Sequence, residues 1–155
     1  MRLEIVGKDE YNLFINKLYV GDIDINDNDS LGKYIKQIII KIRKIYDIML
    51  EGFYEVHVYP VGEFGIILII KNIDKYLSKT VDLKIIVHND EEIYIQIPDY
   101  DQLKNYTNLK YLNNFFYIDI NQLKDKSVLS FAEHYQIVCG ERVKELKVRW
   151  HNLTK

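Results

Sequence analysis

The side chains best suited to acid–base or metal chemistry in this sequence are four histidines and one cysteine. Glu55 and His57 are two positions apart in an alternating segment, so a strand would place them on one face. No two histidines have the spacing of a metal site, and no H-E-x-x-H motif occurs. We therefore interpret Glu55 and His57 as a solvated pair, and we predict neither a metal site nor a cofactor. The histidines are His57, His88, His134 and His151.

The remaining candidates for catalysis lack the partners that their chemistry needs. Cys139 has no flanking motif of a cysteine enzyme, so a buried structural thiol is the better interpretation. The glycines at 62 and 65 are not followed by the Lys-Ser/Thr of a phosphate loop. We predict no catalytic residue. An enzyme would need a deep pocket lined by His57, His88 or Cys139.

The first half of the chain reads as strands around one amphipathic helix. Segments 3–6 and 11–15 form a predicted hairpin, and apolar residues between 18 and 25 would extend it. Apolar positions at steps of three and four predict a helix over 31–50, after a turn rich in N-cap residues. Segments 53–59 and 66–71 then form a second predicted hairpin. The result is a ββαββ unit over residues 1–74.

The pattern breaks at residues 72–80, where we place a boundary. Strands are predicted at 83–87, 93–97, 109–112 and 115–120, and a short helix is predicted after Pro98-Asp99. Residues 128–138 fit a helix or a strand, and 143–150 fit a final helix. The predicted fold is α+β: the ββαββ unit, then a small α+β unit with antiparallel strands over 81–155. Whether the two halves are independent domains or pack as one stays open.

Composition limits the classes of protein to which the chain can belong. Of its 155 residues, 48% are hydrophobic and the formal net charge is −2, which is typical of a globular protein without a global basic field. One cysteine excludes an intrachain disulfide. No apolar run approaches the roughly 20 residues needed to cross a bilayer. We expect a cytoplasmic protein with no membrane partner.

Two segments could form partner surfaces. The helix at 31–50 is basic, but the aromatic interleaving of nucleic-acid binders is missing, so a solvated face is favoured over phosphate binding. The aromatic hairpin must turn alternate rings to opposite faces, which suits either core packing or an exposed partner surface. Its rings are Tyr106, Tyr111, Phe115, Phe116 and Tyr117.

Several segments, in order along the chain, together resemble the MecA family of bacterial adaptor proteins. In the first half, residues 54–60 (YEVHVYP) and 66–71 (IILIIK) resemble the family's strand–turn–strand with proline at the turn. In the second half, the similar segments are 100–103 (YDQL), 109–111 (LKY), 116–118 (FYI) and 131–138 (FAEHYQIV). The family's long acidic linker has no counterpart here.

The resemblance implies a non-enzymatic adaptor. Its first half would capture a target protein, for which the resemblance and the basic helix suggest Lys36, Arg43 and Lys44. Its second half would dock on an Hsp100/Clp-type unfoldase such as ClpC, for which we select Tyr111, Tyr117, Glu133 and His134. The alternative is a small regulatory or immunity-like protein that inhibits one partner by binding. Formation of a homo-oligomer also stays open.

Overall fold

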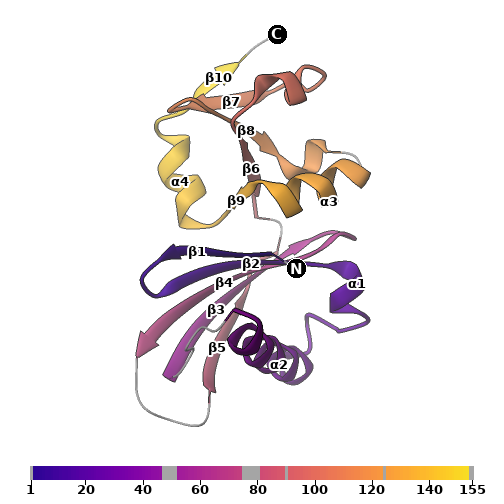
Figure 1. The fold of residues 1–155 in the computed structure, drawn as a ribbon, viewed down its shortest axis with the longest axis vertical. Coiled ribbons are helices and arrows are strands. Elements are labelled where there is room, and N and C mark those ends of the chain that lie inside the picture. Colours follow the sequence, from indigo (N-terminus) through magenta and orange to yellow (C-terminus); the bar gives the residue numbers. More distant parts are fainter. Residues whose placement is uncertain (1, 47–51, 75–80, 90, 124, 154–155) are drawn as a thin grey trace. The chain divides into compact units, whose positions relative to one another are not determined.

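The computed structural model describes residues 2–46, 52–74, 81–89, 91–123 and 125–153, and its helices and strands make the predicted α+β fold (Figure 1). The chain divides into two compact units, residues 1–89 and 90–155. Among the described residues, none of the helices has the length and apolar character needed to cross a membrane.

The first unit is built on a five-stranded sheet with the order β1-β2-β4-β3-β5. Neighbouring strands run antiparallel except for β3 and β5, which are parallel. The strands are β1 (Arg2–Gly7), β2 (Glu10–Asn16), β3 (Gly52–Val61), β4 (Gly65–Asp74) and β5 (Val81–Val87). The two predicted hairpins, β1–β2 and β3–β4, are both present.

The predicted extension of the first hairpin over residues 18–25 is wrong. A short helix, α1 (Lys17–Val20), follows β2 instead. Its start is fixed by Asn16, whose side-chain oxygen accepts a hydrogen bond from the backbone N–H of Leu18 at 2.8 Å. Its end is Gly21, which has the positive φ of 68° that glycine tolerates best. Local capping therefore overrides the apolar alternation.

The predicted amphipathic helix is α2 (Asn28–Tyr46), and the expected residues 47–50 lie outside the described residues. Asp27 caps its start: one carboxylate oxygen accepts from the Asp29 backbone N–H at 3.2 Å and the other from Ser30 Oγ at 2.8 Å. The Ser30 hydrogen bond, chiefly, lowers the pKa of Asp27.

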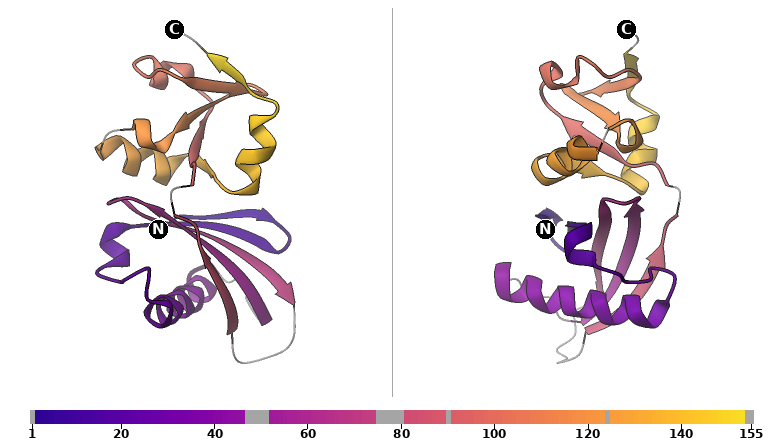
Figure 2. Two further views of the ribbon diagram at one scale, coloured as in Figure 1. Left: turned by 180° about the vertical axis from the view of Figure 1, so that it is seen from behind. Right: turned by 90° about the vertical axis from the view of Figure 1, so that its right-hand side faces the viewer.

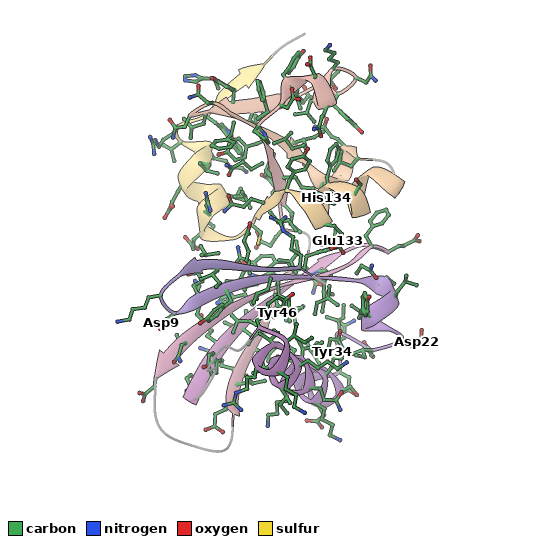
Figure 3. All side chains as sticks on the ribbon, in the orientation of Figure 1. Asp9, Asp22, Tyr34, Tyr46, Glu133 and His134 are labelled. Atoms are coloured by element: carbon green, nitrogen blue, oxygen red, sulfur yellow. The ribbon has the colours of Figure 1, made fainter. Side chains whose placement is uncertain are left out.

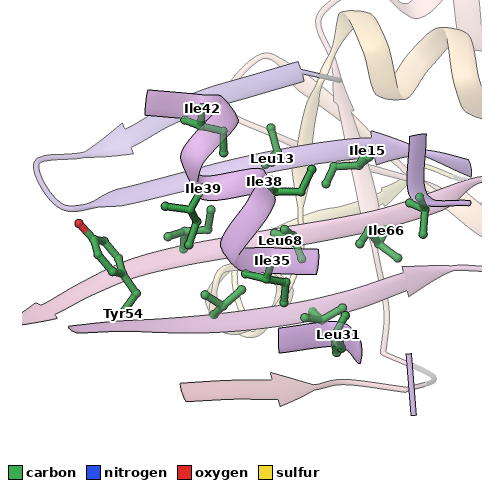
Figure 4. Packing of buried hydrophobic residues seen from close by; sticks show 14 residues of the cluster. Leu13, Ile15, Leu31, Ile35, Ile38, Ile39, Ile42, Tyr54, Ile66 and Leu68 are labelled. Carbon is green, nitrogen blue, oxygen red and sulfur yellow. The ribbon is translucent and has the colours of Figure 1, made fainter. Parts of the chain in front are cut away.

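The helix α2 lies across one face of the five-stranded sheet (Figures 1 and 2), and its apolar stripe forms the core of the first unit with that face (Figure 4). The stripe packs on every second residue of the central strands, because side chains of a strand alternate between faces. Burial of this stripe must hold a helix rich in β-branched isoleucine, a mediocre helix former. The labelled core residues are Leu13, Ile15, Leu31, Ile35, Ile38, Ile39, Ile42, Tyr54, Ile66 and Leu68.

The first unit extends further along the chain than the expected range 1–74. Strand β5 was expected to open the second unit, but it pairs with β3 over Val81–Val87, in register from Gly52↔Val81 to Val58↔Val87. The division therefore falls between Asn89 and Asp90 rather than in residues 72–80. Leu83, Ile85 and Val87 pack against the core under α2, which gives this strand its place in the first unit.

The second unit contains a five-stranded antiparallel sheet with the order β10-β7-β8-β6-β9. Residues 128–138, ambiguous in sequence, contain both the end of a helix and a strand. The strands are β6 (Tyr94–Ile97), β7 (Leu109–Leu112), β8 (Phe115–Asp119), β9 (Gln136–Val138) and β10 (His151–Leu153). The helices are α3 (Asp125–His134), α4 (Glu141–Lys147) and the 3₁₀ turns η1 (Tyr100–Leu103) and η2 (Ile120–Gln122).

The predicted β7–β8 hairpin turns at Asn113 and Asn114. Both residues have positive φ, 52° and 67°, as a two-residue turn of type I′ requires, and asparagine tolerates this conformation better than most residues. The turn sets the register Tyr111↔Phe116 and Lys110↔Tyr117. The hairpin's aromatic rings thus alternate between the two faces.

Candidate functional site

Three aromatic rings gather at the surface of the second unit, around the β7–β8 hairpin. Phe116 lies between Tyr111 and Tyr100, with ring centroids 5.1 and 5.4 Å away and rings tilted by 45° and 43°. Tyr100 is exposed, and Tyr111 and Phe116 are half-buried. The Tyr111 hydroxyl donates a hydrogen bond to Asn114 Oδ1 at 3.0 Å, which orients the ring. We call Tyr100, Tyr111 and Phe116 the aromatic cluster.

The end of α3 lies beside η1, which carries one ring of this cluster. The Tyr135 hydroxyl donates to Gln102 Oε1 at 2.6 Å, and Tyr135 also contacts Phe131 at a centroid distance of 5.6 Å. Glu133 is half-buried and His134 exposed on this helix (Figure 3). The predicted residues therefore lie on two elements, Tyr111 on β7 and both Glu133 and His134 on α3, and the contact with η1 is made by Tyr135, the residue that follows that helix.

Tyr117, selected for the same surface, is buried. Only 3% of its side chain is exposed, and its ring packs 5.8 Å from that of Trp150. Tyr94 meets the same indole edge-on at 4.8 Å, and Val143 of α4 joins them in one core cluster. Burial raises the pKa of the Tyr117 hydroxyl. The side chain of Tyr117 thus belongs to the core of the second unit and is not a surface anchor.

The predicted basic surface lies on α2 of the first unit. Lys36 and Lys44 are exposed, and Arg43 is half-buried and has an interaction of its own. Lys36 also lines a cavity of about 660 Å³ between the first turns of α2 and β5. Its lining includes both signs of charge, so no uniform positive field arises there. The lining residues are Asn28, Asp29, Gly32, Lys33, Lys36, Asp82, Leu83 and Ile85.

A polar chain of three side chains lies on the other face of the first sheet. Glu55 Oε1 lies 2.5 Å from His57 Nε2, and His57 Nδ1 lies 2.7 Å from His88 Nε2. His88 also stacks on Tyr59, with centroids 4.6 Å apart and rings within 7° of parallel. The hydrogen bond from His57 lowers the pKa of Glu55, with smaller contributions from the charges of His57, Lys84 and Lys71.

Glu55 and His57 were expected as a solvated pair, but their side chains are only 25% and 17% exposed, and the link to His88 was not expected. Sequence alternation could identify His57 and Glu55 as neighbours, whereas His88 joins them because β5 pairs in parallel with β3. Among the described residues there is no group of three His, Cys, Asp or Glu side chains arranged to hold a metal ion. Cys139, expected to be a buried thiol, is 4% exposed in the second unit.

Comparison of this chain with protein-family models, with curated proteins and with solved structures gave no match.

Proposed function

We propose that this protein is a non-enzymatic adaptor that binds a target protein and docks it on an Hsp100/Clp-type unfoldase for regulated proteolysis. The observation that carries the proposal is the aromatic cluster of the second unit. Tyr100, Tyr111 and Phe116 contact one another at a surface, and tyrosine and phenylalanine are enriched at the centres of protein interfaces.

The cluster has the physical properties of a binding anchor. Two of its rings lie on a hairpin whose register is fixed on both strands, so little conformational entropy is lost when a partner covers them. Glu133 and His134 lie on α3, whose end is tied to η1 through Tyr135 and Gln102. These polar groups can supply the specificity that an aromatic centre lacks. The second unit would thus hold the unfoldase.

Target capture is assigned to the first unit. Lys36 and Lys44 are exposed on α2, a long helix held rigidly by its buried stripe. Lysines on a rigid helix attract an acidic surface and accelerate the encounter with it. Arg43 lies on the same helix but is half-buried with its own interaction, so it contributes less to this surface.

The docking step is tested with a purified ClpC-type unfoldase. The wild-type chain should co-elute with the unfoldase and raise its ATPase activity. Tyr111→Ala and Phe116→Ala should weaken binding about tenfold or more, because a buried aromatic anchor is worth at least 1–2 kcal/mol. The matched control is Tyr19→Ala, which removes a tyrosine that is 65% exposed on α1 of the first unit. Circular dichroism shows that each variant folds.

Capture of the target is tested separately, by affinity purification from a lysate that contains the unfoldase. Lys36→Glu with Lys44→Glu should lose the captured target and retain the unfoldase. Unchanged ATPase activity and no co-elution of the wild-type chain would contradict the adaptor. One tight complex that contains a single protein and no unfoldase would favour the alternative, a small regulator that inhibits its partner.

A further inference from the structure

We infer that two copies of this chain associate through β5, which pairs antiparallel with β5 of the second copy and joins the two five-stranded sheets into one. The inference is independent of the proposed function. It starts from the position of β5 at the end of the sheet order, where one edge pairs with β3 and no described strand pairs with the other.

The hydrogen bonding of β5 shows which residues face its outer edge. The His88 backbone N–H donates to the Val58 carbonyl of β3 at 2.8 Å. Backbone groups of a strand alternate in direction, so those of Ile86, Lys84 and Asp82 also face β3. The N–H and C=O groups of Leu83, Ile85 and Val87 therefore face outward, in the pattern that a further strand requires.

This edge lacks two of the features by which proteins protect an exposed strand, a bulge and a proline, and its charged residues are Asp82 and Lys84. The pairing of β5 with β3 runs without a register shift, so no bulge bends the strand away, and the strand contains no proline. Strand β1 at the opposite edge differs, since its pairing shifts register between Ile5 and Gly7. Strand β5 is thus the better template for adding a strand.

The charges of β5 favour β5 of a second copy as the strand that pairs with it, and they also favour one register for that pairing. Asp82 and Lys84 alternate with Leu83 and Ile85, which pack under α2, so both side chains leave the strand on its other face. Asp82 is also among the residues that line the cavity between α2 and β5, and it has an interaction within its own chain. A two-fold axis at Leu83 places Asp82 of each copy directly across from Lys84 of the other, as a non-hydrogen-bonded pair with closely spaced side chains. A two-fold axis at Lys84 would instead place the Lys84 side chains of the two copies directly across from each other. The strand is therefore complementary in charge to itself when antiparallel.

The other face of the strand supports the same register. Leu83 and Ile85 pack partly against the core under α2 and also line the cavity between α2 and β5. The axis at Leu83 brings the two Leu83 side chains together at the edge of that cavity. Additional apolar surface is thereby removed from water in both copies, which adds to the hydrogen bonds and the charge pairs.

The test is sedimentation velocity over a range of concentrations, with a charge swap. Asp82→Lys alone and Lys84→Asp alone each place like charges across the axis and should weaken the dimer about tenfold. The double variant Asp82→Lys/Lys84→Asp restores opposite charges and should dimerise near the wild-type level. A monomeric wild type up to millimolar concentration overturns the inference, as does a double variant no tighter than the singles.

A cross-link provides a second measurement if a charge variant fails to fold. Leu83→Cys in a Cys139→Ala background places one thiol at the axis in each copy, at a Cα separation of about 5.5 Å that suits a disulfide. Mild oxidation should convert it to a covalent dimer. The matched control, Ile5→Cys at the β1 edge in the same background, should stay monomeric. Equal cross-linking of the two variants would overturn the inference.

Discussion

Nδ1 of His57 lies 2.7 Å from Nε2 of His88, and the two ring planes are within 17° of parallel, with ring centroids 5.0 Å apart. This geometry fits an in-plane hydrogen bond between two imidazoles, in which one nitrogen donates and the other accepts. The far nitrogen of His57, Nε2, contacts the Glu55 carboxylate, which in its ionised form can only accept, so Nε2 is the donor of that hydrogen bond. In a His57 ring that carries a single proton, Nδ1 then accepts from His88. The ionised Glu55 carboxylate therefore favours the tautomer of His57 that carries its proton on Nε2.

The stability of the first unit should depend on the ionised Glu55. Its pKa is lowered in the folded chain, chiefly by the His57 hydrogen bond. A lowered carboxyl pKa stabilises the fold above the unfolded-state pKa, and this contribution disappears as the pH falls through the folded-state value. Glu55→Gln should therefore cost about 1 kcal/mol at neutral pH, and the cost should vanish in acid. Urea unfolding between pH 7 and about 3 measures it.

The control for that experiment is Glu63→Gln, an exposed carboxylate in the β3–β4 turn. It should follow the wild-type pH dependence. If Glu55→Gln loses as much stability at low pH as the wild type does, the hydrogen bond to His57 contributes nothing to the fold.

Tyr94 should make the chain lose stability at high pH. Burial, followed by the charges of Glu92 and Asp119, raises the pKa of Tyr94 to about 12. Because the pKa of Tyr94 is higher in the folded chain, the phenol of the unfolded chain ionises at a lower pH. The contribution of neutral Tyr94 to the stability of the fold is therefore complete below the unfolded-state pKa and is lost as the pH rises toward 12. The free energy of unfolding is measured for the wild type and for Tyr94→Phe at pH 8 and at about pH 11. Between these pH values Tyr94→Phe should lose less stability than the wild type. An equal loss in both proteins would contradict the prediction.

Gly65 should tolerate no side chain. Its φ is 148°, and a Cβ built on it would lie 2.0 Å from the carbonyl oxygen of Ile15 on the neighbouring strand β2. Gly65→Ala must therefore separate β2 from β4, and we expect a loss of more than about 3 kcal/mol or failure to fold. The control is Gly62→Ala in the same turn, where φ is 49° and the Cβ meets nothing within 4 Å. Gly62→Ala should cost about 1 kcal/mol. Similar thermal midpoints for the two variants would mean that the close approach of Gly65 to Ile15 does not exclude a side chain at position 65.

Two isoleucines on α2, one buried and one exposed, allow the effect of burial on stability to be measured apart from the effect of helix propensity. Ile35 is fully buried against the sheet, whereas Ile40 is 46% exposed. Both changes to alanine improve propensity, but Ile35→Ala also leaves a cavity and should cost about 2–5 kcal/mol. Ile40→Ala should change stability by less than about 0.5 kcal/mol. Denaturant unfolding measures both values, and equal effects would mean that the stripe does not hold the helix.

The sequence predicted those elements of the fold that local patterns determine. The apolar spacing along α2 identified the helix and its buried face, and Asn113-Asn114 identified a hairpin turn. The apolar pattern at 83–87 also predicted a strand, but not its neighbour. Parallel pairing of β5 with β3 depends on the fit to the core under α2, which no local pattern reports. For this reason the position of the boundary and the link from His57 to His88 were not predicted.

In the candidate site too, local sequence patterns could not report contacts that depend on the tertiary structure, as the aromatic hairpin shows. Alternation turns Tyr111 and Tyr117 to opposite faces of the hairpin, but it could not say which face would be covered. The answer depends on Trp150 and on α4, which approach the face of Tyr117 from the end of the chain. Tyr111 is half-buried and keeps part of its ring at the surface, whereas Tyr117, selected with it, is buried. Phe116 and Tyr100 were not selected, because their contact depends on the position of η1.

The strand order of the first unit sets a sequence of events during synthesis on the ribosome. The β1–β2 hairpin emerges first, but β2 must wait for β4, which is translated about fifty residues later, before its second edge is paired. Strand β3 then keeps an uncovered edge until Val87 leaves the exit tunnel. For that interval the nascent chain exposes an unpaired strand edge of the kind that favours aggregation.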